Sequence, residues 1–60
     1  MPVVIVEMWK GRTNEQRKKL VEGITAAFAS IGTRTDTVQV ILKENEKDHW
    51  AQNGKLCSEQ

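Results

Sequence analysis

Residues 2–8 form the most apolar run of the chain and are rich in valine and isoleucine. A run of this length and composition is typical of a strand that is covered on both faces, in a parallel sheet or at an interface between copies of a chain. Gly11 follows the run and marks a turn. We therefore predict a first strand over residues 2–8 that is buried and ends in a turn.

The next segment has the apolar spacing of a helix, at Leu20, Val21, Ile24, Ala27, Phe28 and Ile31. Thr13 and Gln16 precede it in the pattern of a capping box, in which each side chain accepts a hydrogen bond from the other residue's main-chain amide. Gly32 follows the last apolar position, where a glycine commonly ends a helix. The pattern predicts a helix of about 18 residues between Thr13 and Gly32.

Residues 33–37 are polar and predict a loop, and residues 38–44 are rich in β-branched side chains, as strands are. Two strands joined by one helix predict a β-α-β unit, in which the strands run parallel. The tail, residues 45–60, is less regular, and its Asn53-Gly54 pair is a strong hairpin signal. We expect this C-terminal arm to dock on another subunit.

The chain has 60 residues, which makes one domain, residues 1–60. A chain of this size buries only about 60% of the surface that its unfolded form exposes, so such domains usually need disulfides, a metal or association. Cys57 is the only cysteine and cannot form an intramolecular disulfide. His49 and Cys57 are too few for a structural zinc site, which takes four ligands. We therefore expect no metal, and we expect self-association to complete the core.

The formal net charge is +1, with nine basic and eight acidic residues. Such a balanced surface gives no general attraction to nucleic acid or to a membrane surface, and we expect neither as a partner. No apolar run approaches the roughly 20 residues that span a bilayer. The first residues also lack the basic and apolar regions of a signal peptide. These features together predict a cytoplasmic protein.

Pro2 offers the clearest candidate chemistry. If Met1 is removed, the chain begins with a secondary amine at the end of an apolar strand. A free α-amino group titrates near ~8, and burial lowers that pKa because it disfavours the charged form. An amine whose pKa lies near the working pH is an effective general base.

Four segments together carry a family resemblance: Pro2, residues 11–16 (GRTNEQ), residues 38–44 and residues 47–50 (KDHW). In their order and spacing the chain resembles the small-subunit tautomerases of the 4-oxalocrotonate tautomerase family over its whole length. The resemblance implies an α/β protomer, β-α-β with parallel strands and a C-terminal arm, assembled as a homohexamer (a trimer of dimers). It also implies an isomerase without a cofactor, which converts enol or dienol forms of small 2-keto acids to the keto or conjugated form.

The family's site residues are carried over by position. Pro2 matches the catalytic general acid/base, and Arg12 matches the catalytic arginine that binds the substrate carboxylate. Trp50 stands where the family has an aromatic wall, usually phenylalanine or tyrosine. Gln39 occupies the place of a second arginine that comes from a neighbouring subunit, so it is a substrate-binding candidate without the charge. Arg34, in the preceding loop, is a possible replacement for that charge.

Each of these residues also has a plainer interpretation. Pro2 can be no more than a protease-resistant start, Trp50 a packing anchor and Gln39 a residue that faces solvent. His49 is expected at the surface. Two alternative functions therefore remain: a non-catalytic oligomeric homologue, favoured by Gln39 and by a retained Met1, and a hydratase or dehalogenase of the same superfamily.

Overall fold

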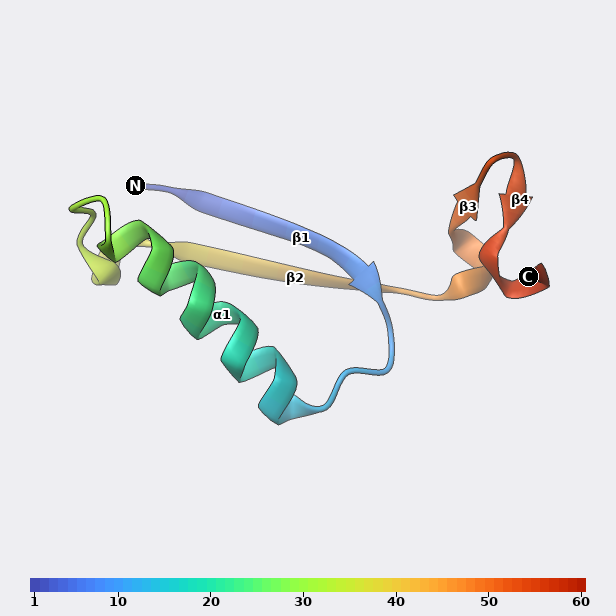
Figure 1. The fold of residues 1–60 in the computed structure, drawn as a ribbon, viewed down its shortest axis with the longest axis horizontal. Coiled ribbons are helices and arrows are strands. Elements are labelled where there is room, and N and C mark those ends of the chain that lie inside the picture. The colour runs from blue at the N-terminus through green and yellow to red at the C-terminus, as the bar shows by residue number, and fades with distance from the viewer.

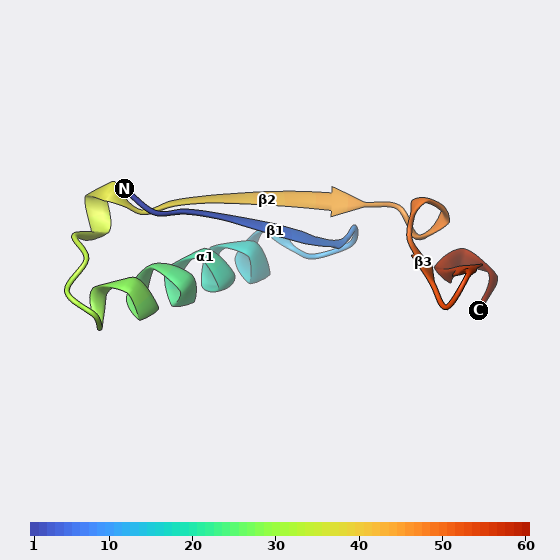
Figure 2. The same cartoon turned by 90° about the horizontal axis from the view of Figure 1, so that it is seen from above.

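The computed structural model describes residues 1–60, which form a β-α-β unit and a projecting arm. Strand β1 (Val3–Trp9) and strand β2 (Gln39–Asn45) pair in parallel, from Val3 opposite Gln39 to Trp9 opposite Asn45. Helix α1 (Asn14–Ala29) joins them and lies along one face of this sheet (Figures 1 and 2). The predicted fold class, including the parallel strands, is confirmed.

The helix begins with the predicted capping box. The side-chain oxygen of Thr13 accepts a 3.1 Å hydrogen bond from the amide of Gln16, and the Gln16 side chain accepts one of 3.0 Å from the amide of Thr13. These two bonds satisfy amides that a helix start otherwise leaves free. They fix where α1 starts relative to the loop before it.

The helix ends earlier than its apolar pattern predicts. Its last residue is Ala29, Ser30 caps it, and Gly32 lies in the following turn with φ of 92°. The amide of Thr33 closes this turn with a 3.1 Å bond to the carbonyl of Phe28. The turn leaves Ile31 75% exposed, so its predicted place in the helical stripe is wrong.

The two faces of the sheet differ in what covers them. Val6 and Met8 point toward α1 and are half-buried. The opposite face carries apolar side chains that nothing in the chain covers, because Val3, Ile5 and Ile41 are 50%, 55% and 44% exposed. One chain therefore covers only one of the two faces that the strand pattern predicts to be covered.

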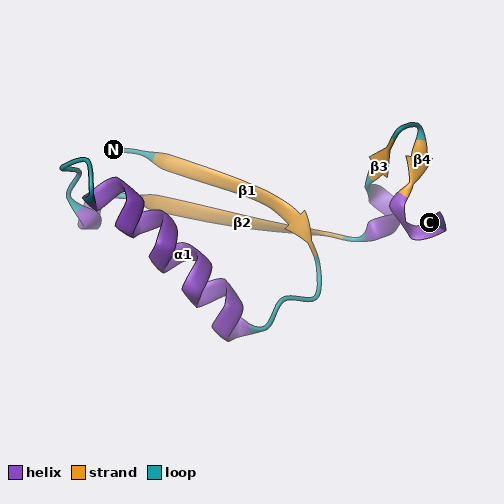
Figure 3. Cartoon of the chain, viewed as in Figure 1, coloured by secondary structure: helices purple, strands orange, loops and turns teal.

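The C-terminal arm begins with a turn of 3₁₀ helix (Lys47–His49) and continues as a hairpin of β3 (Ala51–Gln52) and β4 (Lys55–Leu56). The turn between these strands has positive φ at Asn53 (55°) and Gly54 (76°), as the sequence pair predicts. A last 3₁₀ turn follows (Cys57–Glu59). The arm projects from the end of β2, away from the helix (Figure 3).

A single chain has almost no core. Cys57, whose amide donates a 2.7 Å bond to the carbonyl of Trp50, is the only buried residue. The accessible surface is 4819 Å², whereas a folded monomer of 6.8 kDa exposes about 4,000 Å². The radius of gyration is 14.4 Å, against about 10 Å for a compact domain of this length.

No helix is long and apolar enough to cross a bilayer.

Candidate active site

Pro2 lies directly before β1, beside the first residue of β2. Its carbonyl oxygen accepts a 3.0 Å hydrogen bond from the amide of Gln39, which places these two predicted site residues at the same end of the sheet. Met1 precedes Pro2 and is 85% exposed; its sulfur lies 3.9 Å from the side-chain nitrogen of Gln39. While Met1 is attached, the nitrogen of Pro2 is an amide and carries no basic lone pair.

Arg12 lies at the other end of the sheet, in the loop that leads from β1 to α1. The guanidinium of Arg17 holds this loop, because it donates a 2.6 Å bond to the carbonyl of Arg12 and lies 3.4 Å from the carboxylate of Glu44 in β2. Arg12 is the only arginine whose own guanidinium has no carboxylate partner, since Arg34 is paired as well. Its charge is therefore available to an anion.

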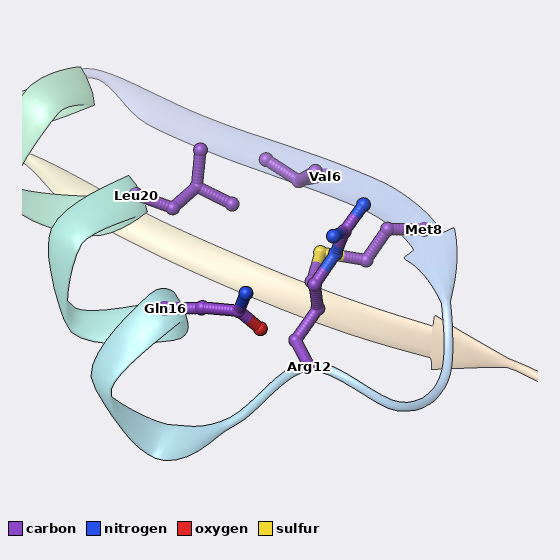
Figure 4. A pocket seen from close by; sticks show the side chains of 5 residues that line it. All are labelled: Val6, Met8, Arg12, Gln16 and Leu20. Atoms are coloured by element: carbon purple, nitrogen blue, oxygen red, sulfur yellow. The ribbon is translucent and has the colours of Figure 1, made fainter.

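Arg12 also lines a cleft of about 300 Å³ between β1 and the first turns of α1. Figure 4 shows its side chain reaching from the loop toward Val6 and Met8, with Leu20 and Gln16 on the opposite wall. The cleft thus places a free guanidinium against mostly apolar side chains. Arg12 itself is exposed, so an anion can reach its guanidinium from solvent.

Two tryptophans meet at the same end of the sheet as Arg12. The ring centroids of Trp9 and Trp50 are 6.0 Å apart and the ring planes cross at 74°, an edge-to-face arrangement. Sequence reasoning selected Trp50 but missed Trp9. The signal was present, because Trp9 is a large aromatic residue at the end of an apolar strand and three residues before Arg12.

The predicted site residues therefore fall into two groups within one chain. Pro2 and Gln39 lie at the start of the two strands, whereas Arg12 and Trp50 follow their ends. Seven strand residues separate Pro2 from the loop of Arg12, a length of about 20 Å at the usual rise per residue. Pro2 and Arg12 of one chain therefore lie too far apart to contact the same small molecule.

The remaining candidates are peripheral. Arg34 is 80% exposed at its side chain and is paired with Asp36 at 2.7 Å, so its charge is already partly compensated. His49 is exposed at the end of the Lys47–His49 turn. No group of three histidine, cysteine, aspartate or glutamate side chains is arranged to hold a metal ion.

The β-α-β unit, with its arm and its proline-led first strand, defines the chain as a small α/β protein of the tautomerase fold. The family model described as "Tautomerase enzyme" matches residues 2–60. The chain belongs to the tautomerase family, which makes it an isomerase-type enzyme.

Relatives and solved structures agree with this assignment. A 2-hydroxymuconate tautomerase of Bacillus subtilis is 42% identical over 60 residues, which cover 98% of this chain and 97% of the relative. The crystal structure of YwhB, a homologue of 4-oxalocrotonate tautomerase, matches with a TM-score of 0.91 at 40% identity and covers 98% of both chains. A heterohexameric 4-oxalocrotonate tautomerase from Chloroflexus aurantiacus matches with a TM-score of 0.89 at 28% identity, covering 98% of this chain and 97% of that one.

Proposed function

We propose that the protein is a tautomerase that converts enol or dienol forms of small 2-keto acids to their keto or conjugated forms. The amine of Pro2, freed by removal of Met1, is the general acid/base, and Arg12 binds the substrate carboxylate. The observation that carries this proposal is that the two-stranded sheet presents one part of a site, here called a half-site, at each of its ends. One end presents Pro2 with Gln39, and the other presents the unpaired guanidinium of Arg12 beside an aromatic wall.

The separation of the half-sites implies that a complete site uses residues of two or more copies. A small enol acid is much shorter than the roughly 20 Å that β1 spans between them. The uncovered sheet face with Val3, Ile5 and Ile41 gives the copies an apolar surface through which to associate. We propose a homohexamer, a trimer of dimers, in the cytoplasm; the heterohexameric relative supports six-chain assembly.

In the proposed reaction, the neutral amine of Pro2 accepts the proton of the enol hydroxyl. As the carbonyl forms, the electron pair moves along the conjugated system, and the protonated amine returns one proton to carbon. Arg12 holds the carboxylate. The side-chain amide of Gln39 donates a hydrogen bond to the oxygen that bears developing charge. Trp9 and Trp50 lie with Arg12 and so reach Pro2 from a neighbouring copy, where they exclude water; this desolvation lowers the pKa of the amine toward neutrality.

The proposal is tested by comparing two forms of the protein from which Met1 is removed, as checked by intact mass. Wild type is expected to accelerate ketonisation of a 2-hydroxydienoate or an aryl-enolpyruvate, followed by ultraviolet absorbance. The Pro2→Ala variant is expected to lose about a hundredfold in kcat/KM, the usual contribution of a positioned general base. Equal rates for the two forms would exclude Pro2 as the base.

A second candidate function is a non-catalytic assembly that binds small acids. One observation favours it: Gln39 supplies no charge beside Pro2. The intact mass of the natural protein, together with the ketonisation assay, separates the two. A protein that keeps Met1 when purified from its natural host, and that catalyses no ketonisation, supports the binding function.

A further inference from the structure

A second hollow lies beside the aromatic pair, at the loop that carries Arg12. Its volume is about 220 Å³, and it is lined by Trp9, Lys10, Gly11, Arg12 and Lys47. Arg12 lines this hollow as well as the cleft against α1. Three of its five lining residues are cationic and none is acidic.

The cations of the hollow differ in whether they are already neutralised. The ammonium of Lys10 lies 3.1 Å from the carboxylate of Glu46. Neither Lys47 nor Arg12 has a carboxylate partner anywhere in the chain. The main-chain amides of Gly11 and Arg12 also donate no hydrogen bond within the chain. The hollow therefore gathers positive charge, and none of its lining residues is an anion.

Lys47 is placed at this hollow by one contact of its own and by an ion pair of the preceding residue. Its ammonium lies 4.7 Å from the centroid of the Trp9 ring, a cation–π contact that keeps the charge over the ring face. The neighbouring ion pair of Lys10 and Glu46 ties the residue before Lys47 to the loop after β1. Lys47 thus belongs to the same local structure as the aromatic pair and Arg12, although it follows Arg12 by 35 positions in sequence.

We propose that Lys47 is a second cation for the substrate carboxylate, positioned by Trp9, and that it makes the site select enol carboxylates over uncharged enols. This inference rests on the proposed function, because it adds a second partner to the substrate carboxylate that Arg12 binds. Lysine offers three rotatable donors on a flexible stem and so can follow that carboxylate. An ester of the same acid presents no charge and gains nothing from Lys47.

The test is a binding measurement that needs no turnover. Binding of 3-phenylpropionate and of its methyl ester is followed by intrinsic tryptophan fluorescence, since Trp9 lies against Lys47. Wild type is expected to bind the acid more tightly than the ester. Lys47→Gln is expected to weaken binding of the acid about tenfold, the scale of one charge-assisted hydrogen bond. Binding of the ester is expected to stay unchanged. Lys47→Arg is expected to restore most of the affinity for the acid.

The matched control is Lys18→Gln, which removes the same charge from the exposed face of α1. The inference is overturned if Lys47→Gln and Lys18→Gln weaken binding of the acid equally, or if Lys47→Gln weakens binding of acid and ester alike. It is also overturned if wild type binds the acid no more tightly than the ester. Ketonisation of an aryl-enolpyruvate is measured in parallel. Lys47-dependent binding without turnover would support the anion site and reject the proposed reaction.

Discussion

The main-chain amide of Gln39 donates a 3.0 Å hydrogen bond to the carbonyl oxygen of Pro2. The bond acts on the carbonyl side of Pro2, whereas Met1, on the nitrogen side, is 85% exposed and has its sulfur 3.9 Å from the side-chain nitrogen of Gln39. The bond also places Gln39, which stands where the family has its second arginine, next to Pro2 of its own chain. Any substrate that reaches the amine of Pro2 therefore meets the start of β2.

Replacing Gln39 by leucine should lower kcat for ketonisation by about a hundredfold, as loss of one donor to a developing oxyanion typically does. KM should change less, because the hydrogen bond strengthens as charge develops. The Gln39 side chain is exposed in the isolated chain, so thermal unfolding serves as the control and should change little. An unchanged kcat would show that Gln39 does not contact the reacting oxygen.

Mixing two inactive variants should restore activity. In an assembly of Pro2→Ala and Arg12→Ala chains, one chain supplies the intact arginine and the other the intact proline. If a site joins the two from different copies, random mixing of subunits gives about a quarter of sites both intact residues. The measurement is the ketonisation rate after joint refolding. The double variant Pro2→Ala/Arg12→Ala is the control and should stay inactive, and no recovery in the mixture would place both residues in a site from one copy.

Arg17 should act as a positioning residue for Arg12. Arg17→Met removes the 2.6 Å bond to the Arg12 carbonyl and the contact with Glu44. Hydrogen bonds to charged groups contribute about 1.5–3 kcal/mol, so the Arg12 loop should loosen and KM should rise several-fold while kcat changes less. Arg17→Lys, which keeps the charge, should recover part of the loss. A purely structural role would lower the melting temperature of both variants without altering KM.

The uncovered face of the sheet should be an assembly surface. Ile5→Glu places a charge among the apolar side chains of this face, next to Ile41 in the strand register. Burying that charge unpaired costs several kcal/mol, so the variant should run as a smaller species by sedimentation velocity and lose activity. Lys19→Glu, on the exposed side of α1, is the control and should assemble normally. An Ile5→Glu protein that assembles as wild type does would exclude this face as the interface.

The sequence predicted the local structure well where the signal is short-range. The capping box of Thr13 and Gln16 and the turn at Asn53-Gly54 each rest on contacts between residues a few positions apart, and both are found. The parallel strands followed because a helix between two strands has few other arrangements. The end of the helix was missed because Ile31 continues the apolar spacing while the chain already turns at Ser30.

The site was harder to predict because it depends on distances through space. The family pattern assigns roles to Arg12 and Trp50 by their positions in the sequence, and position alone does not show which residues of one chain meet in space. The pairing of Trp9 with Trp50 joins the end of β1 to the arm, and nothing in either local sequence indicates it. The distance between Pro2 and Arg12 could have been estimated from the length of the first strand, since a strand cannot fold back on itself.

The accessible surface of the single chain, 4819 Å² against about 4,000 Å² for a folded monomer of its mass, has a consequence for how the protein is handled. Where burial of apolar surface occurs between chains, folding and association form one equilibrium, and the unfolding midpoint depends on protein concentration. Specific activity should therefore fall on dilution instead of staying constant. A thermal melt repeated over a hundredfold range of concentration would record this as a rising midpoint, the signature of a protein whose interior is assembled from several chains.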